Sequence, residues 1–191
     1  MKEVSVIIQE ALQVLKDGGV ILYPTDTVWG LGCDATNGKA VARIYEIKRR
    51  ADSKALVLLA CDLDMVARHV RTVPDAAIDL VEVNDGSPMT LIYPDAVGLA
   101  PNVVAEDGSV GIRVPLNDFC VALVRKLRRP LVSTSANISG EPTPKKFKDI
   151  PQEIRDAVDY IVAPALEKDS TGKPSQIIKV GPGSEVKVIR M

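Results

Sequence analysis

Short, continuous apolar runs of strand length alternate along this chain with segments of helical periodicity. The clearest run is Ala55 to Ala60 (ALVLLA), which has no polar position that could face solvent. Such a run is typical of a strand covered on both faces, as in a sheet flanked by helices. The alternation predicts an α/β fold, with helices packed on a twisted, mixed, open sheet.

The expected elements follow from periodicity and from turn residues. Apolar residues recur at helical spacing over 4–15, and Asp17-Gly18-Gly19 follows where a glycine ends a helix. Further helices are expected around 41–48, after the N-cap Asp62, over 75–83, after the N-cap Asp118, and over 151–158. Strands are expected at 20–23, 55–60, 89–93, 109–114 and 131–133, with a closing hairpin of 177–180 and 185–190. The stretches 25–34 and 135–148 are expected to be loops. No linker or repeat divides the sequence, which predicts one domain spanning residues 1–191.

The composition narrows the function classes. Twenty-four basic and 25 acidic residues give a net charge of −1, so no global field attracts nucleic acid or an anionic membrane, and any anion site must be local. The three cysteines, Cys33, Cys61 and Cys120, contain no C-x-x-C pair, which argues against a disulfide framework or a zinc site. Acidic residues interrupt the apolar amino terminus, and no uncharged run approaches ~20 residues. A cytoplasmic protein without a membrane association is expected.

Two glycine motifs resemble nucleotide loops but lack the required context. Gly30 to Ala35 matches G-x-G-x-x-G/A, yet the residues from Pro24 to Trp29 separate it from the preceding strand. Gly38-Lys39 is followed by Ala40, so a Walker loop would lack its magnesium-binding hydroxyl. With one histidine in the chain, no metal site made by protein side chains is predicted. The chemistry is therefore expected to depend on positioning and on charge neutralisation.

Three segments carry suitable side chains. The first is Lys48-Arg49-Arg50 with Lys54, whose cations could hold a polyphosphate or a carboxylate, although the helix dipole alone also favours basic residues there. The second is Ser133 to Gly140 (STSANISG), at the carboxyl end of a predicted strand, where either a ligand site or an ordinary polar turn is expected. The third is Pro24 to Gly32 (PTDTVWGLG), in which Trp29 could be a ligand platform or, more commonly, a core residue.

Together these segments resemble the YrdC-like threonylcarbamoyl-AMP synthases, in their short single-domain form. The family signatures are a P-T-[DE]-T-x-[YW]-G-L-G loop, a K-x-R pair and an S-x-N triplet. Here they stand as Pro24 to Gly32, Lys48 to Arg50 and Ser135 to Asn137. The similarity runs in order from about Val20 to Arg190. One departure is Ala51, where the family commonly has proline after K-x-R, so that loop is expected to be less rigid.

The resemblance implies an enzyme that forms threonylcarbamoyl-AMP and pyrophosphate from ATP, L-threonine and bicarbonate, with Mg²⁺ bound to the ATP. Other proteins, the threonylcarbamoyl-transferases, would then modify tRNA adenosine. Carried over position by position, the threonine-binding residues would be Thr25, Arg113 and Ser133. The nucleotide and carbamate region would be lined by Lys48, Arg50, Lys54, Ser109, Ser135, Asn137, Thr143 and Arg190, with Lys48 and Arg50 in the catalytic role.

Two other functions remain open from the sequence. The first is a non-catalytic member that binds double-stranded RNA or tRNA through the same basic concavity, with contacts from residues such as Lys126, Arg128 and Arg129. The second is a related carbamoyl-adenylate activity, as in hydrogenase-maturation carbamoyltransferases. Those proteins carry zinc-finger-like cysteine pairs, which this sequence lacks.

Overall fold

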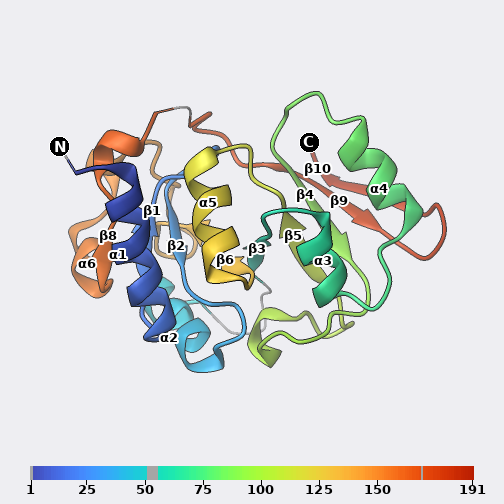
Figure 1. Cartoon of the computed structure of the whole chain (residues 1–191), viewed down its shortest axis with the longest axis horizontal. Coiled ribbons are helices and arrows are strands. Elements are labelled where there is room, and N and C mark those ends of the chain that lie inside the picture. Colours follow the sequence, from blue (N-terminus) through green and yellow to red (C-terminus); the bar gives the residue numbers. More distant parts are fainter. Residues whose placement is uncertain (1, 51–55, 169) are drawn as a thin grey trace.

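The computed structural model describes residues 2–50, 56–168 and 170–191, and its strands form two sheets (Figure 1). The smaller sheet has the order β7-β2-β1-β8 and the larger has the order β10-β9-β4-β5-β3-β6. The strands are β1 (Ile21–Tyr23), β2 (Gly30–Gly32), β3 (Val57–Leu59), β4 (Met89–Tyr93), β5 (Val110–Arg113), β6 (Leu131–Val132), β7 (Thr134–Ser135), β8 (Tyr160–Ile161), β9 (Gln176–Val180) and β10 (Val186–Arg190). The helices are α1 (Val4–Lys16), α2 (Gly38–Lys48), α3 (Leu63–His69), α4 (Asp75–Glu82), α5 (Asp118–Leu127) and α6 (Gln152–Ala157).

The α/β class and the mixed strand directions are confirmed, and the strands are divided between two sheets instead of lying in one. In the larger sheet β3 runs parallel to β5 and antiparallel to β6, while β4 runs antiparallel to β5 and parallel to β9. The two sheets adjoin in sequence at 131–135, because β6 belongs to the larger sheet and β7 to the smaller one. The polar segment that follows β6 therefore lies at the junction of the two sheets.

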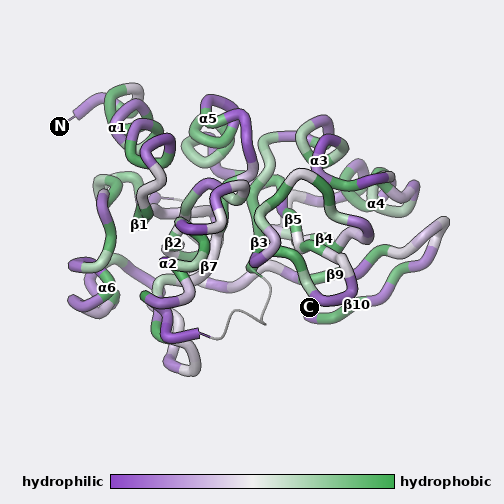
Figure 2. The backbone as a smooth tube through the Cα atoms, turned by 90° about the horizontal axis from the view of Figure 1, so that it is seen from below, coloured by the Kyte–Doolittle hydropathy of each residue, from purple (hydrophilic) through white to green (hydrophobic). Residues whose placement is uncertain are grey.

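Helices α1 and α5 contact each other, and their apolar stripes explain why. The buried residues of α1 are Ile7, Ile8, Ala11, Leu12 and Leu15, and those of α5 are Phe119, Cys120, Leu123, Val124 and Leu127. Both sets recur every three or four residues, as one face of a helix requires. In Figure 2 the strands of the interior are mostly hydrophobic, and the outer turns of the helices are mostly hydrophilic. None of the helices in the described residues has the length and apolar character that crossing a membrane would need.

Several details differ from the sequence-based expectations, including β7, which pairs with β2 and was not expected as a strand. The expected loop 25–34 contains β2, which pairs antiparallel with β1. Strand β8, which pairs parallel with β1, was not expected, because its two residues are too few to show a period. The N-cap of α5 is Asn117 and not Asp118, since the Asn117 side chain accepts a hydrogen bond from the amide of Cys120 at 3.0 Å. Asp62 is confirmed as the N-cap of α3.

Candidate active site

A cavity of about 370 Å³ lies between elements of the two sheets and collects most of the predicted site residues. Of those residues, the ones that line it are Arg50, Arg113, Ser133, Ser135, Thr143 and Arg190. They come from the end of α2, from β5, from the 133–143 segment and from β10, which are far apart in the sequence. The fold thus brings six of the predicted site residues to one cavity.

Three arginines, Arg50, Arg113 and Arg190, line this cavity, and no acidic residue does so among the residues that the structure describes. Hydroxyl groups from Thr27, Ser133 and other residues complete the polar part of the lining. Arginine side chains that gather on a lining without acidic residues favour a positive potential inside the cavity, although Asp26 behind the wall pairs with Arg113 and the whole chain has a net charge of −1. The cavity is therefore suited to a multiply charged anion.

Arg113 is held in one orientation from behind. Its side chain is only 3% exposed and forms an ion pair with the equally buried Asp26. A second, longer hydrogen bond runs from Arg113 Nη2 to Thr27 Oγ1 at 3.4 Å. The other oxygen of Asp26 accepts from the Leu116 amide at 3.1 Å. Because a guanidinium has five N–H donors, Arg113 keeps donors for a ligand while this pair fixes its plane.

Lys48 lies behind the cavity wall and not in the lining. It is 2% exposed, and its Nζ donates to the carbonyl oxygens of Ser135 at 2.5 Å and Asn137 at 2.8 Å, and to Asn137 Oδ1 at 3.2 Å. Burial, with a smaller contribution from the charge of Arg50, lowers the pKa of Lys48 to about 8. In the structure Lys48 is therefore the group that holds the Ser135-to-Asn137 turn in place.

The end of α2 explains why Lys48 and Arg50 have different environments. Arg49 adopts the left-handed conformation (φ 49°), and the Arg50 amide returns to the carbonyl oxygen of Tyr45 at 2.9 Å. This turn leaves Lys48 in the interior and Arg50 in the cavity, while Arg49 pairs with Glu153 on the surface at 2.8 Å. Burial lowers the pKa of Arg50.

Asn137 also supports the wall from behind. Its side chain accepts a hydrogen bond from Ser135 Oγ and donates to two carbonyl groups, those of Ile138 at 3.1 Å and Glu141 at 2.7 Å. Ser135 itself lines the cavity, as do Ser133 and Thr143. The S-x-N triplet thus presents one hydroxyl to the cavity and uses the amide to fix the turn.

Thr25 shapes the Pro24-to-Gly32 loop from within. It is buried, and its Oγ1 donates to the Val28 carbonyl oxygen at 2.7 Å and accepts from the amides of Thr27 at 3.1 Å and Val28 at 3.3 Å. A hydroxyl that binds its own backbone in this way fixes a turn. The structure places Thr27, and not Thr25, in the cavity lining.

A β-bulge directs Arg190 to the cavity. Strand β10 advances two residues, from Val188 to Arg190, while β9 advances one, from Ile178 to Ile177. The Arg190 guanidinium then donates from Nε at 3.0 Å and from Nη2 at 2.6 Å to the carbonyl oxygen of Ser175, another lining residue.

Ser109 lies in a second, adjoining cavity of about 200 Å³. That cavity shares Leu56, Val57 and Ile177 with the larger one, and its lining is mostly apolar. The Ser109 hydroxyl donates to Asp107 at 2.5 Å. The pair of cavities offers a charged compartment beside an apolar one.

The remaining predicted site residue, Lys54, falls outside the described residues, as do Ala51 and the rest of 51–55. Among the residues that are described, no group of three or more His, Cys, Asp and Glu side chains could hold a metal ion. In the described part of the chain, two carboxylates bind lining residues from behind: Asp26, bound to Arg113 and to the Leu116 amide, and Glu167, bound to the Trp29 indole and to the Phe147 amide.

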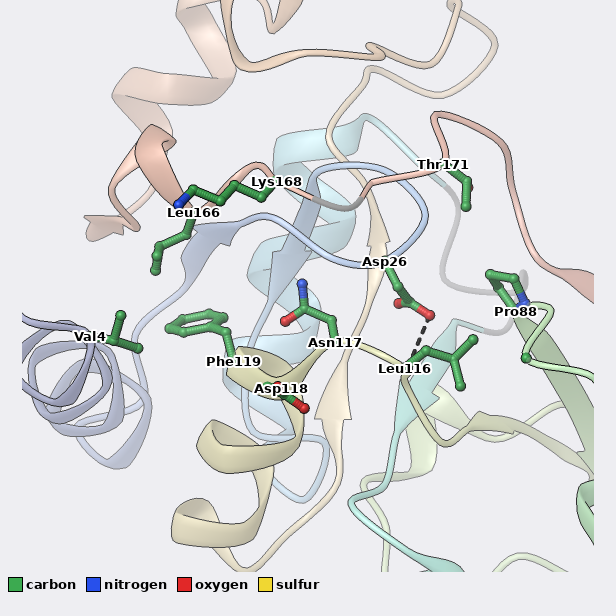
Figure 3. A pocket seen from close by; sticks show the side chains of 11 residues that line it. Val4, Asp26, Pro88, Leu116, Asn117, Asp118, Phe119, Leu166, Lys168 and Thr171 are labelled. Carbon is green, nitrogen blue, oxygen red and sulfur yellow. Dashed lines mark hydrogen bonds between the residues drawn. The ribbon is translucent and has the colours of Figure 1, made fainter.

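A separate cavity of about 450 Å³ has Asp26 among its lining residues (Figure 3). Figure 3 shows Asp26 bonded to the Leu116 amide, with Asn117, Phe119 and Lys168 around the space. Its polar groups do not include the three arginines described above. It contains none of the predicted site residues.

Three hydroxyl-bearing residues of the lining, Thr27, Thr134 and Ser175, were not among the predicted site residues. Thr27 lies in the recognised Pro24-to-Gly32 motif, and the turn made by Thr25 decides which of the two hydroxyls faces the cavity. Ser175 follows Pro174 in a polar stretch without periodicity, so no local signal distinguishes it.

Comparison with known proteins identifies the family. A sequence model of the Sua5/YciO/YrdC family, described as telomere recombination, matches residues 13–191. The chain is similar to the threonylcarbamoyl-AMP synthase of Hahella chejuensis, with 33% identity over 177 residues, which are 93% of this chain and 95% of that protein. It is also similar to the threonylcarbamoyl-AMP synthase of Marinobacter nauticus, with 35% identity over 176 residues, 92% of each chain.

Solved structures share the fold. Escherichia coli YciO superimposes with a TM-score of 0.81 at 26% identity, over 100% of this chain and 90% of that one. Sua5 of P. abyssi, solved in complex with L-threonine, gives a TM-score of 0.82 at 24% identity over 94% of this chain. This chain spans only 52% of that Sua5 chain, so the likeness concerns the fold of the shared part. The family model and the two synthases each cover most of the sequence, and the chain therefore belongs to the Sua5/YciO/YrdC family.

Proposed function

We propose that this chain is an L-threonylcarbamoyladenylate synthase, which forms threonylcarbamoyl-AMP and pyrophosphate from ATP, L-threonine and bicarbonate. The observation that carries the proposal is the convergence of Arg50, Arg113 and Arg190 with serine and threonine hydroxyls on one cavity. Relatives named threonylcarbamoyl-AMP synthase, at 33% and 35% identity over more than nine tenths of the chain, support it. The product would serve N6-threonylcarbamoyladenosine modification of tRNA by threonylcarbamoyl-transferase proteins, in the cytoplasm.

The amino acid would bind at the Arg113 end. The guanidinium fork of Arg113 matches a carboxylate, and the buried Asp26 keeps that fork in one plane before the ligand arrives. Ser133 and Thr27 offer hydroxyls on the same wall. Thr25 would contribute by holding the loop that carries Thr27.

The nucleotide would bind across the rest of the cavity. Arg50, Arg190, Ser135 and Thr143 line the part that suits the triphosphate, and Lys54 would join them from outside the described residues. Ser109 and the apolar residues of the adjoining cavity suit the nucleoside. Lys48 and Asn137 would act by fixing the turn that presents Ser135.

The chemistry would consist of two steps. The threonine amine adds to the carbon of bicarbonate, with loss of water, and the resulting carbamate oxygen attacks the α-phosphorus of ATP. The bond from the α-phosphorus to the bridging oxygen breaks, and pyrophosphate leaves with the negative charge. Arg50 and Arg190 would stabilise that charge as it develops. Mg²⁺ would be held by the phosphates and by water, since the lining offers no free carboxylate in the described part of the chain, and when bound it would add to the neutralisation of charge.

The test is pyrophosphate release by the purified protein with ATP, bicarbonate and Mg²⁺, with and without L-threonine, combined with product identification by mass spectrometry. We expect pyrophosphate and threonylcarbamoyl-AMP only when threonine is present. Pyrophosphate release at the same rate without threonine would contradict the proposal.

Two arginine variants sharpen this test. Arg113→Lys keeps the positive charge but loses the two-pronged guanidinium that matches a carboxylate. The KM for threonine should therefore rise on the order of tenfold or more, because a charged hydrogen-bonded pair contributes about 1 to 3 kcal/mol. The KM for ATP should change little. Arg43→Lys is the matched control, because Arg43 pairs with Asp159 away from the cavity. An equal loss for both substrates in Arg113→Lys would contradict the assignment of Arg113 to threonine.

A further inference from the structure

The Pro24-to-Gly32 loop is hydrogen-bonded to a short segment, residues 166–168 and 170–172, which we call the strap. Three of its hydrogen bonds reach consecutive carbonyl groups of the loop. They are Ser170 Oγ to the Thr27 oxygen at 2.5 Å, the Gly172 amide to the same oxygen at 2.8 Å, and the Thr171 amide to the Asp26 oxygen at 3.0 Å. Gly172 has a φ of 67°, a conformation that side chains rarely adopt, so the strap turns there at a position suited to glycine. The strap thus binds the backbone of this loop at Asp26 and Thr27.

One side chain of the strap, Glu167, reaches the cavity wall itself. Its Oε2 accepts hydrogen bonds from the indole Nε1 of Trp29 at 2.6 Å and from the amide of Phe147 at 2.6 Å. Trp29 lines the cavity and is fully buried. An indole has a single polar N–H, so this bond to a carboxylate determines which edge of the ring faces the strap.

Trp29 packs against Phe147, and Phe147 in turn contacts Arg155. The rings of Trp29 and Phe147 lie 5.0 Å apart at 48°, and the Arg155 guanidinium lies 5.3 Å above the centre of the Phe147 ring. Both distances are in the range of favourable aromatic and cation–π contacts. Glu167 therefore binds both aromatic residues, through the Trp29 indole N–H and the Phe147 backbone amide.

We infer that Glu167 is a positioning residue, which holds the Trp29 indole in the cavity wall and thereby keeps the loop of Thr27 in the shape that receives the amino acid. The inference rests on the proposed function for its substrate, but the contact with Trp29 can be tested without it. Glu167 lines no part of the cavity and would touch neither substrate. Its effect on threonine would pass through Trp29 and through Thr27, two residues earlier in the same loop, which receives the longer hydrogen bond from Arg113.

The chain offers a direct probe, because Trp29 is its only tryptophan. Acrylamide quenching of tryptophan fluorescence therefore reports on this one ring. In Glu167→Ala we expect quenching to increase at least about twofold and the emission to shift, since the indole N–H loses its acceptor and the ring becomes accessible. Glu167→Gln retains an amide oxygen as acceptor, so it should return quenching close to the wild-type value.

A second experiment measures the KM for threonine and the KM for ATP in the same variants. We expect the KM for threonine to rise about tenfold in Glu167→Ala, with the KM for ATP and kcat within about twofold of wild type and with partial recovery in Glu167→Gln. Glu10→Ala is the matched control, because Glu10 also accepts a hydrogen bond from an aromatic side chain, Tyr160 at 2.6 Å, but neither residue lines the cavity. It should change neither KM.

Two results would overturn the inference. The first is unchanged Trp29 quenching in Glu167→Ala. The second is a loss of threonine and ATP use in equal proportion that follows a lower melting temperature, as expected of a residue that only stabilises the fold. If the wild-type protein shows no threonine-dependent pyrophosphate release, the proposed function fails, while the quenching of Trp29 still decides whether Glu167 holds the indole.

Discussion

Lys48 shows how one residue can belong to a functional motif without facing the ligand. The sequence places it in a cluster of cations, next to Arg50, and the resemblance assigns both to the nucleotide. In the structure the ammonium of Lys48 is buried and donates to the main chain of Ser135 and Asn137. A lysine can satisfy three acceptors in a small space, which suits it to closing a turn from the inside.

This role predicts a loss of stability in Lys48→Met, a variant of similar length without donors. The carbonyl oxygens of Ser135 and Asn137 would lose the ammonium as a donor, although the Ser135 oxygen would keep the Asn137 amide, and we expect a cost of about 1 to 3 kcal/mol in the free energy of unfolding near pH 7. Urea denaturation measures the difference, and Lys16→Met is the control, because Lys16 also ends a helix but is exposed. A Lys48→Met protein as stable as the wild type would show that Lys48 does not hold the turn.

The same pair of proteins tests the pKa of Lys48. Its folded pKa of about 8 lies below the ordinary value of 10.5, so between these values the unfolded chain binds more protons than the folded one. The wild-type free energy of unfolding should therefore rise, relative to Lys48→Met, as the pH increases from about 8 to 10.5, and show no such change below pH 7. A constant difference across this window would indicate an unperturbed lysine.

At the scale of an element, β2 is a strand whose glycines make room for the residues around it. A Cβ at Gly32 would lie 2.6 Å from the Tyr23 ring and 2.9 Å from the Val132 carbonyl oxygen, whereas the nearest atom to a Cβ at Gly30 would be 3.4 Å away. Gly32→Ala should therefore destabilise the protein by about 1 to 3 kcal/mol, and Gly30→Ala by less than about 1 kcal/mol. Thermal or urea unfolding of the two variants provides the comparison. Equal stabilities would show that Tyr23 and β6 can move aside.

The same strand illustrates what the sequence could and could not predict. Elements with a clear period, such as α1 and β4, lie within a residue of their expected bounds. The glycines of β2 carry no side chains and so give no period, although Leu31 between them is fully buried. For the site, motifs predicted the residues that gather at the cavity, but which side chain of each motif faces it depends on turns, such as those at Thr25 and Arg49, that no local pattern reveals.

At the scale of the whole molecule, three arginines line one cavity, while several cations on the surface pair with carboxylates. On the surface Arg43 pairs with Asp159, Arg129 with Asp34 and Lys179 with Asp107. Each of these pairs adds little stability on its own, and each lowers the local positive charge that an RNA backbone would contact. This arrangement favours the synthase over an RNA-binding protein, for which the net charge of −1 is already unsuitable.

We therefore expect weak binding of double-stranded RNA or tRNA by the isolated chain, with a dissociation constant no tighter than about 1 μM near physiological salt, in the range of non-specific contacts. Fluorescence anisotropy at several salt concentrations measures this, and the logarithm of the affinity should fall only gently with the logarithm of salt, since few phosphates would be neutralised. Replacing Lys126, Arg128 and Arg129 by glutamine should leave threonine-dependent pyrophosphate release unchanged, because none of them lines the cavity. The opposite outcome would be nanomolar binding that depends steeply on salt and that these three substitutions abolish. It would assign RNA recognition to the chain, through a surface formed by the end of α5 and not through the cavity.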